Sequence, residues 1–314
     1  MWSRRAVLGS GLALGAGLLL PGQSRAATDQ LTIALAAEPP QLDPTAGDAP
    51  ATEAVAFQNL FEGLTRIDRD GRLQPCLARS WIAGADGRSY RFTLEPSVRY
   101  HDGTSFDAGH VVFSLERLIA PESRNPHRGI YAAITGATAL DDTTVEVTLA
   151  GPDADLLRKL ALGPASIVAP ESADNNGLEP IGTGPFAYQQ WDRGADIVLV
   201  RNEDYWGTHP RLSQVDFVFY PDPAAAVAAL LGGTLDAYPD FPEPALLAPL
   251  QGNPALQLVT GKAPDGSPRV GVWSSKLSGM WPDAPVASCV LADLRWADDH
   301  GAPLTPMPDP TTDD

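Results

Sequence analysis

The 314-residue sequence has little cysteine, little histidine and no excess of positive charge. Its two cysteines, Cys76 and Cys289, lie far apart without a CxxC pair, so neither a zinc framework nor a disulfide scaffold is encoded. The formal net charge of −17 argues against a nucleic-acid-binding protein, because a polyphosphate partner requires a positive surface. No apolar run after residue 26 is long enough to span a bilayer.

The composition is that of a chain with a hydrophobic core. Hydrophobic residues make up 44% and charged residues 19%, which excludes a disordered polyelectrolyte. The length favours about two domains. The 30 prolines and 29 glycines favour many short strands over a helical bundle. Strands separated by helices and mixed with hairpins predict α/β and α+β units, without a cofactor.

Residues 1–26 resemble an export signal. Arg4 and Arg5 precede an apolar run from Ala6 to Leu20, and a small-x-small cleavage site ends at Ala26. The paired arginines resemble the twin-arginine signal. A membrane anchor is the alternative, but this run of about 15 residues is shorter than the ~20 that span a bilayer. We therefore expect cleavage near Ala26 and a periplasmic mature protein that does not insert stably into the membrane.

Local patterns predict the main elements. Asp107 is expected to cap a helix that continues to Ile119, and Asp222-Pro223 to begin another that closes at Gly232-Gly233. An apolar stripe predicts a helix from about Thr52 to just before Gly63. Strands are expected at 31–35, 90–94, 145–149, 186–191, 197–200 and 215–220.

Several blocks in order resemble extracytoplasmic solute-binding proteins of family 5, the receptors of peptide, nickel and related ABC importers. Each block is weak alone, and the order makes the resemblance specific over residues 31–259. The blocks are Glu38–Pro44, Leu60–Leu64, Leu77–Trp81, Asp86–Leu94, Tyr100–Asp107, Val111–Leu115, Ile181–Phe186, Arg201–Trp206 and Leu235-Asp236.

The resemblance implies a type II periplasmic-binding-protein fold, with two lobes joined by a hinge and an extra subdomain. Lobe I is expected to be discontinuous, from residues 27–62 and 179–261, with the extra subdomain at 63–178. Ligand binds between the lobes of such receptors, and closure presents the loaded receptor to the transporter.

The family pattern is expected to stop after residue 261. Residues 262–314 carry eight prolines and three of the seven tryptophans, without a sustained apolar period. We expect a disordered, non-family tail, with lobe II largely missing. Two origins stay open: a natural short variant, or a truncated or frameshifted product. Affinity in these receptors comes from enclosing the ligand on both sides, so this form is expected to bind poorly.

The resemblance implies the substrate-binding subunit of an ABC importer, which captures peptides or similar small solutes and delivers them to permease subunits. In relatives the loop after the first strand lines the cleft and offers backbone groups to a peptide. The expected substrate-binding residues are Thr45, Gly47, Asp48, Ala49 and Pro50. The alternatives are a receptor for a nickel chelate or an opine, and a fragment that only docks to other subunits.

Other motifs favour structural roles over enzymatic ones. Gly182–Ala187 fits a dinucleotide GxGxxA pattern, but a strand is expected after it, which favours a tight turn. His101 and His110 are interpreted as a turn residue and a first-turn helix residue, and no metal site is expected. No GxSxG elbow occurs, so we expect no enzyme. Two free thiols are the simpler interpretation of Cys76 and Cys289, and their pairing stays open.

The acidic surface has two interpretations. Negative charge keeps an exported receptor soluble, which is the simpler one. A preference for cationic peptides is the alternative.

Overall fold

The structure is a computed structural model, in which residues 29–68, 71–262 and 268–275 are described. Its larger sheet has seven strands and joins the first strand of the described chain to strands from beyond residue 185. In their order across the sheet these are β12 (Leu256–Lys262), β13 (Pro268–Ser274), β11 (Ala237–Tyr238), β1 (Gln30–Leu35), β10 (Gln214–Phe219), β9 (Asp196–Arg201) and β8 (Phe186–Asp192).

Strand β1 lies inside this sheet and is parallel to both of its neighbours, β10 and β11. The other pairings are antiparallel. The adjacent residues Ile33 and Ala34 point to opposite faces and are both buried, as expected for a strand covered on both sides. The strands expected near β1, β8, β9 and β10 are confirmed, with shifts of no more than one residue at their ends.

The predicted end of the lobe at residue 261 is wrong. Strand β13 lies between β12 and β11, and Val272 and Trp273 are almost fully buried. Gly271 and Ser274 are buried as well, so both faces of this strand are covered. A strand buried on both faces shows no period of two, which is why its sequence resembled a tail without pattern. The remainder of the expected tail, residues 263–267 and 276–314, lies outside the described residues.

A second, four-stranded antiparallel sheet lies within residues 78–149. Its order is β4 (Ala78–Ala83), β5 (Ser89–Leu94), β7 (Thr144–Leu149) and β6 (Ile134–Asp141). Phe92 and Leu94 of β5 and Val145 and Val147 of β7 are buried, which confirms the alternation expected in these strands. A separate hairpin pairs β2 (Thr65–Ile67) with β3 (Leu73–Pro75).

Helix α2 (Ala108–Ile119) packs against the four-stranded sheet through its apolar face. Asp107 caps it as predicted, because its Oδ1 accepts hydrogen bonds from the backbone N–H groups of Gly109 (2.8 Å) and His110 (3.3 Å). Val111 and Leu115 on the inner face are buried. The opposite, polar side of α2 is therefore free to contact other parts of the molecule.

Helix α1 (Pro50–Ala56) is shorter than the apolar stripe indicated. The side-chain amide of Asn59 donates to the carbonyl oxygens of Ala54 and Val55, each at 3.1 Å, and so occupies the last turn. Phe57 adopts an extended backbone conformation (φ −73°, ψ 132°), which ends the helix, and Gln58 follows with a φ of 57°. The stripe residues Leu60 and Phe61 are still buried, but from an irregular turn.

Helix α4 (Pro223–Gly232) confirms its predicted ends. Asp222 Oδ1 accepts a hydrogen bond from the N–H of Ala224 at 3.0 Å, and Gly233 closes the helix with a φ of 70°. The remaining short helices are η1 (Arg128–Tyr131), α3 (Leu156–Lys159), η2 (Gly163–Ala165) and η3 (Pro244–Leu247).

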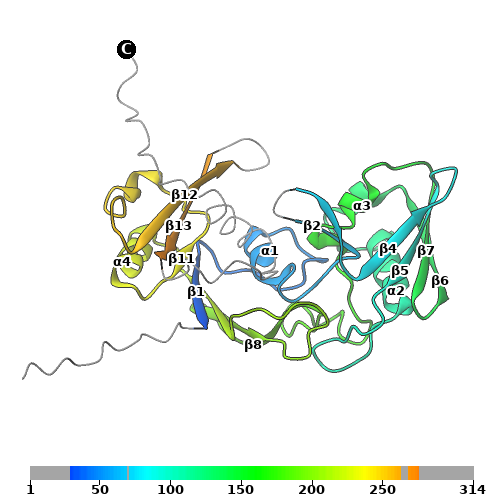
Figure 1. The fold of residues 1–314 in the computed structure, drawn as a ribbon, viewed down its shortest axis with the longest axis horizontal. Coiled ribbons are helices and arrows are strands. Elements are labelled where there is room, and N and C mark those ends of the chain that lie inside the picture. The colour runs from blue at the N-terminus through cyan, green and yellow to red at the C-terminus, as the bar shows by residue number, and fades with distance from the viewer. Residues whose placement is uncertain (1–28, 69–70, 263–267, 276–314) are drawn as a thin grey trace, which may run out of the picture.

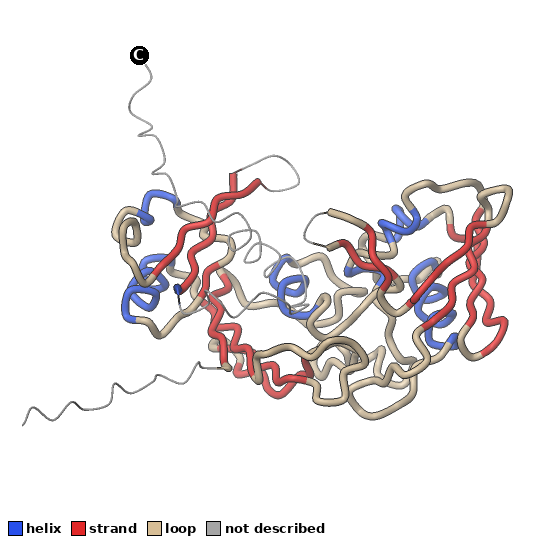
Figure 2. Tube along the Cα trace, viewed as in Figure 1, coloured by secondary structure: helices blue, strands red, loops and turns tan. Residues whose placement is uncertain are grey.

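The two sheets lie at opposite ends of an elongated arrangement, with α1 between them (Figures 1 and 2). One hydrophobic cluster gathers around the four-stranded sheet and α2, from Leu64 to Ala169. Two others cover the seven-stranded sheet, one of them with α4. The division into lobe I (27–62 and 179–261) and a subdomain (63–178) remains a prediction, amended by the inclusion of β13.

No helix among the described ranges is both long and apolar enough to cross a membrane. The expected signal segment, residues 1–26, lies outside those ranges, and so does Cys289.

Candidate functional site

The loop after β1 is held by a buried turn. Asp43 Oδ1 accepts hydrogen bonds from the backbone N–H of Thr45 at 2.8 Å and from its hydroxyl at 2.6 Å. Both residues are buried, with 3% and 8% of their surface exposed. A short carboxylate side chain that binds the backbone two residues later is a common device for fixing a turn. The position of Thr45 is therefore set by its own neighbour.

Arg117 joins this turn to helix α2. Its Nη2 lies 3.1 Å from Asp43 Oδ2, and its Nη1 donates to the hydroxyl of Thr45. The carboxylate of Asp43 thus has both a cationic partner and local hydrogen bonds, which is how a buried charge is stabilised. Because Arg117 lies on the polar side of α2, this contact fixes the loop after β1 against the unit built on the four-stranded sheet.

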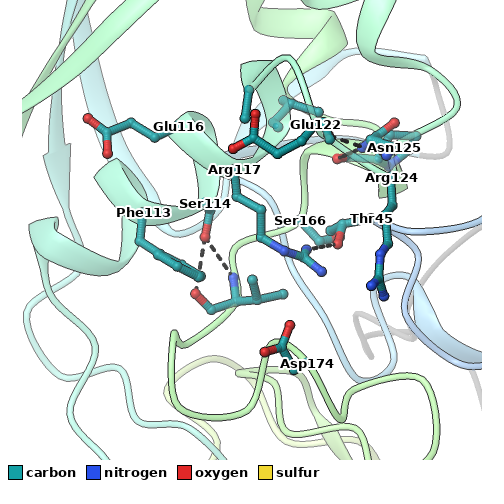
Figure 3. Close-up of a pocket in the computed structure, with 15 residues that line it drawn as sticks. Thr45, Phe113, Ser114, Glu116, Arg117, Glu122, Arg124, Asn125, Ser166 and Asp174 are labelled. Atoms are coloured by element: carbon teal, nitrogen blue, oxygen red, sulfur yellow. Dashed lines mark hydrogen bonds between the residues drawn. The ribbon is translucent and has the colours of Figure 1, made fainter.

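A pocket of about 440 Å³ opens beside Thr45. Its walls come from α2 and the segment that follows it, from the turn near η2, and from the loop after β1 (Figure 3). The lining residues are Thr45, Phe113, Ser114, Glu116, Arg117, Leu118, Ala120, Glu122, Ser123, Arg124, Asn125, Pro164, Ser166, Val168 and Asp174.

Hydrogen bonds fix two walls of the pocket to each other. Ser114 Oγ accepts the backbone N–H of Val168 at 2.9 Å and lies 2.8 Å from the carbonyl oxygen of His110. The side-chain amide of Asn125 donates to the carbonyl oxygen of Pro164 at 2.8 Å. These bonds connect α2 and the segment after it to residues 164–168, so the shape of the pocket is set before any ligand arrives.

The charges in the pocket are not all paired. Arg117 is neutralised by Asp43, whereas no other described residue forms an ion pair or side-chain hydrogen bond with Arg124, Glu116, Glu122 or Asp174. Ser166 is only 2% exposed, and its Oγ has no hydrogen-bond partner in the described structure. A buried hydroxyl without a partner is unfavourable, so this atom stands out.

Among the predicted substrate-binding residues, Thr45 alone lines the pocket. Asp48 and Pro50 are exposed, Ala49 precedes the first turn of α1, and Pro50 begins that helix. Gly47 lies against Gln41, where an added Cβ would come within 2.4 Å of Nε2. A role for these four residues in binding remains a prediction.

Arg117, Arg124 and Ser166 were not singled out from the sequence. Arg117 resembles any charged residue on the solvent side of an amphipathic helix. Ser166 follows a buried turn and carries no motif. They form one pocket only because the fold brings them close to Thr45, which is 72 residues away from Arg117 in the sequence.

The GxGxxA pattern forms a tight turn, as expected. A Cβ at Gly182 would lie 1.9 Å from the carbonyl oxygen of Leu60, and one at Gly184 would lie 2.2 Å from that of Asn59. The strand β8 follows at once, so no helix N-terminus faces the glycines as a pyrophosphate site requires. The nucleotide interpretation is thereby excluded for this segment.

His101 supports this turn and is not a ligand. Its Nδ1 accepts the N–H of Gly182 at 3.2 Å, and its Nε2 lies 3.1 Å from the carbonyl oxygen of Gly184. Burial lowers the pKa of His101 to about 4. His110 lies in the first turn of α2, as predicted. Within the described ranges, no three His, Cys, Asp or Glu side chains are grouped so as to hold a metal ion.

Comparison with known proteins identifies the family. The family described as bacterial extracellular solute-binding proteins, family 5 Middle, matches residues 72–275. The chain belongs to this family. The family is non-enzymatic, and the match extends past residue 261, in agreement with the position of β13.

Relatives in the family bind different solutes. The chain is 32% identical to the nickel-binding periplasmic protein of Escherichia coli K12 over 56% of this chain and 35% of that protein. It is 29% identical to the glutathione-binding protein GsiB of the same strain, over 68% of this chain and 42% of that one. The chain thus spans less than half the length of these relatives.

Solved structures of relatives share the fold. The periplasmic binding protein AgaA from A. tumefacien R10, in complex with agropinic acid, has a TM-score of 0.70 and 30% identity over 74% of this chain and 48% of AgaA. DppA from Helicobacter pylori, in complex with the peptide STSA, has a TM-score of 0.67 and 27% identity over 74% of this chain and 50% of DppA. The fold is therefore that of periplasmic binding proteins of family 5, of which the chain covers about half.

Proposed function

We propose that the protein is a periplasmic solute-binding component of an ABC importer, which captures peptides or similar small solutes and passes them to permease subunits. The observation that carries this proposal is the 440 Å³ pocket beside Thr45, in a chain of the solute-binding family. Its size lies within the range of small-molecule sites. Its walls are fixed by hydrogen bonds, as a site that binds without reorganisation requires.

A non-peptide solute is the second candidate. The relatives named above include receptors for nickel and for agropinic acid, so the family does not restrict the ligand to peptides. The solutes bound by these relatives do not decide which solute this chain binds. Export through a signal within residues 1–26, with cleavage near Ala26, is part of the proposal.

Isothermal titration calorimetry of the 314-residue chain tests the proposal. The panel contains short peptides, glutathione, nickel–histidine and agropinic acid. Saturable binding of at least one solute supports a receptor, with the weak affinity that we predict for this form. Because weak binding is expected, the titration extends to millimolar solute; no saturable binding of any member of the panel at that concentration contradicts the proposal. A fragment that only docks to permease subunits then becomes the better account, which co-purification with those subunits tests.

The predicted loop residues have their own test. Asp48→Asn removes one exposed charge three residues after Thr45, and we expect it to weaken binding of the solute found in the panel. Asp155→Asn removes a similarly exposed charge from a distant segment and serves as the matched control. Equal affinities of the two variants and the unchanged chain contradict a role for Asp48.

A further inference from the structure

The glycine turn, residues 182–184, lies where the chain passes between two hydrophobic clusters. Ile181 packs against the cluster around the four-stranded sheet, and Phe186 belongs to a cluster on the seven-stranded sheet. The segment after α1 makes the reverse passage, since Leu60 belongs to the second cluster and Leu64 to the first. The glycine turn is therefore part of the junction between the two clusters.

His101 holds this turn from the side of the four-stranded sheet, where its neighbour Tyr100 is buried in the cluster. The backbone N–H of His101 donates to the carbonyl oxygen of Gly182 at 2.9 Å. In return the ring Nδ1 accepts the N–H of Gly182, so the ring hydrogen lies on Nε2 and points to the carbonyl oxygen of Gly184. Only the neutral ring, in this one tautomer, makes both side-chain bonds.

The charged groups around the ring come from two segments. Asp102 acts on the ring directly and favours its protonated form, as does the hydrogen bond to Gly184, but burial outweighs both and holds the pKa of His101 at about 4. Glu62, from the segment after α1, binds the hydroxyl of Thr183 at 3.0 Å and so contacts the same turn without bonding to the ring. The ring is therefore neutral at pH 7.

The glycine turn has other bonds in which His101 takes no part. The N–H of Gly184 donates to the carbonyl oxygen of Leu60, and the N–H of Phe186 donates to that of Asn59, each at 3.0 Å. Both acceptors lie in the irregular turn after α1. The contact with His101 can therefore be lost while the glycine turn keeps its place against the segment after α1.

We infer that His101 is an acid-sensitive clamp, which releases the loop at residues 100–103 from the glycine turn when Nδ1 takes up a proton. The imidazolium ring carries a hydrogen on each nitrogen, so Nδ1 no longer accepts and instead faces the N–H of Gly182, another donor. The released state loosens the junction between the two clusters without unfolding either of them. This device goes beyond solute binding and does not depend on it.

Amide hydrogen exchange of the 314-residue chain, followed by NMR between pH 7 and pH 4.5, tests the inference. Rates are expressed relative to those of an unstructured peptide at the same pH. We expect the protection of the Gly182 amide to fall roughly fiftyfold, because the released ring takes up a proton near pH 6.5 and the clamped ring only near pH 4. The amides of Gly184 and Phe186 should keep their protection.

Two results of this experiment overturn the inference. Constant protection of Gly182 shows that protonation does not release the loop. Equal losses at Gly182, Gly184 and Phe186 show that the whole region unfolds together, so that no separate clamp exists. Neither result depends on whether a solute binds, so the inference and the proposed function are tested independently.

Variants and the ring itself give further tests. In His101→Asn the Oδ1 atom replaces Nδ1 as an acceptor that does not titrate, so the protection of Gly182 should no longer depend on pH. His127→Gln removes an exposed histidine and should keep the dependence of the unchanged chain. If His101→Asn does not fold, the ¹⁵N signals of the ring in the unchanged chain still decide, since a hydrogen on Nδ1 at pH 7 contradicts the clamp.

Discussion

The hydroxyl of Tyr205 donates a hydrogen bond of 2.8 Å to Glu62 Oε1, although 143 residues separate them. The other carboxylate oxygen of Glu62 accepts from Trp206 Nε1 at 2.9 Å and from the Thr183 hydroxyl at 3.0 Å. Glu62 is 4% exposed, and burial raises the pKa of its carboxyl above the ordinary value. The network joins the turn after α1 to the segments before β8 and β10.

Tyr205→Phe tests how much this network contributes to the stability of the fold. The change removes one donor from a buried carboxylate without altering its packing, and we expect the free energy of unfolding to fall by about 1–3 kcal/mol. Urea unfolding followed by fluorescence measures it. Tyr188→Phe is the control, since its hydroxyl has no such partner and the residue is partly exposed. Equal stabilities of both variants contradict the account.

The Arg117–Asp43 pair should contribute more to the free energy of unfolding than an exposed ion pair does. Arg117→Gln leaves Asp43 buried without its cation, and we expect a loss of about 3 kcal/mol in the free energy of unfolding. Arg91→Gln breaks an exposed pair with Glu146 and should cost less than about 1 kcal/mol. Chemical denaturation of the two variants compares them. A cost for Arg117→Gln no larger than that for Arg91→Gln would show that the pair does not fix the loop after β1.

Because burial lowers the pKa of His101, we expect the stability of the protein to depend on pH. The pKa of His101 is about 4 in the folded chain and 6.5 in the unfolded one, so the unfolded state takes up a proton first as the pH falls. The stabilisation is complete above pH 6.5 and is lost toward pH 4, by up to about 3 kcal/mol. In His101→Asn this part of the dependence should disappear, whereas the exposed control His127→Gln should keep it. If the free energy of unfolding changes with pH in the same way in the unchanged chain and in His101→Asn, the prediction is wrong.

Gly184 has no room for a side chain. Gly184→Ala places a methyl group 2.2 Å from the backbone oxygen of Asn59, and because backbone atoms must move, we expect a loss of at least about 3 kcal/mol. Gly129→Ala, with open space around its Cβ position, is the matched control and should be nearly neutral. Thermal unfolding compares the two. A Tm unchanged in Gly184→Ala would contradict the close approach of the two segments.

Local patterns predicted those elements whose signals are themselves local. The cap at Asp107, the ends of α4, and the alternation in β5 and β7 depend on neighbouring residues, and the structure confirms them. The end of α1 depends on the side chain of Asn59 reaching back to Ala54 and Val55, which no helical period reveals. Strand β13 shows no alternation of apolar and polar residues, because it lies between two other strands and both of its faces are buried.

The candidate site was predictable only in part for a related reason. The family resemblance directs attention to Thr45, and the structure places Thr45 in the pocket wall. Arg117, Arg124 and Ser166 come from segments 70 or more residues further along the chain, and nothing in their local sequence distinguishes them from solvated or buried structural residues. Their grouping follows from the packing of α2 against the loop after β1.

Hydrogen–deuterium exchange with and without saturating solute tests the central claim, that the solute is held between the loop after β1 and the C-terminal half of α2. The account predicts slower exchange in residues 41–50, 114–125 and 164–168 when a solute identified by calorimetry is present. Unchanged exchange in these segments, with protection confined to other parts of the chain, would contradict it.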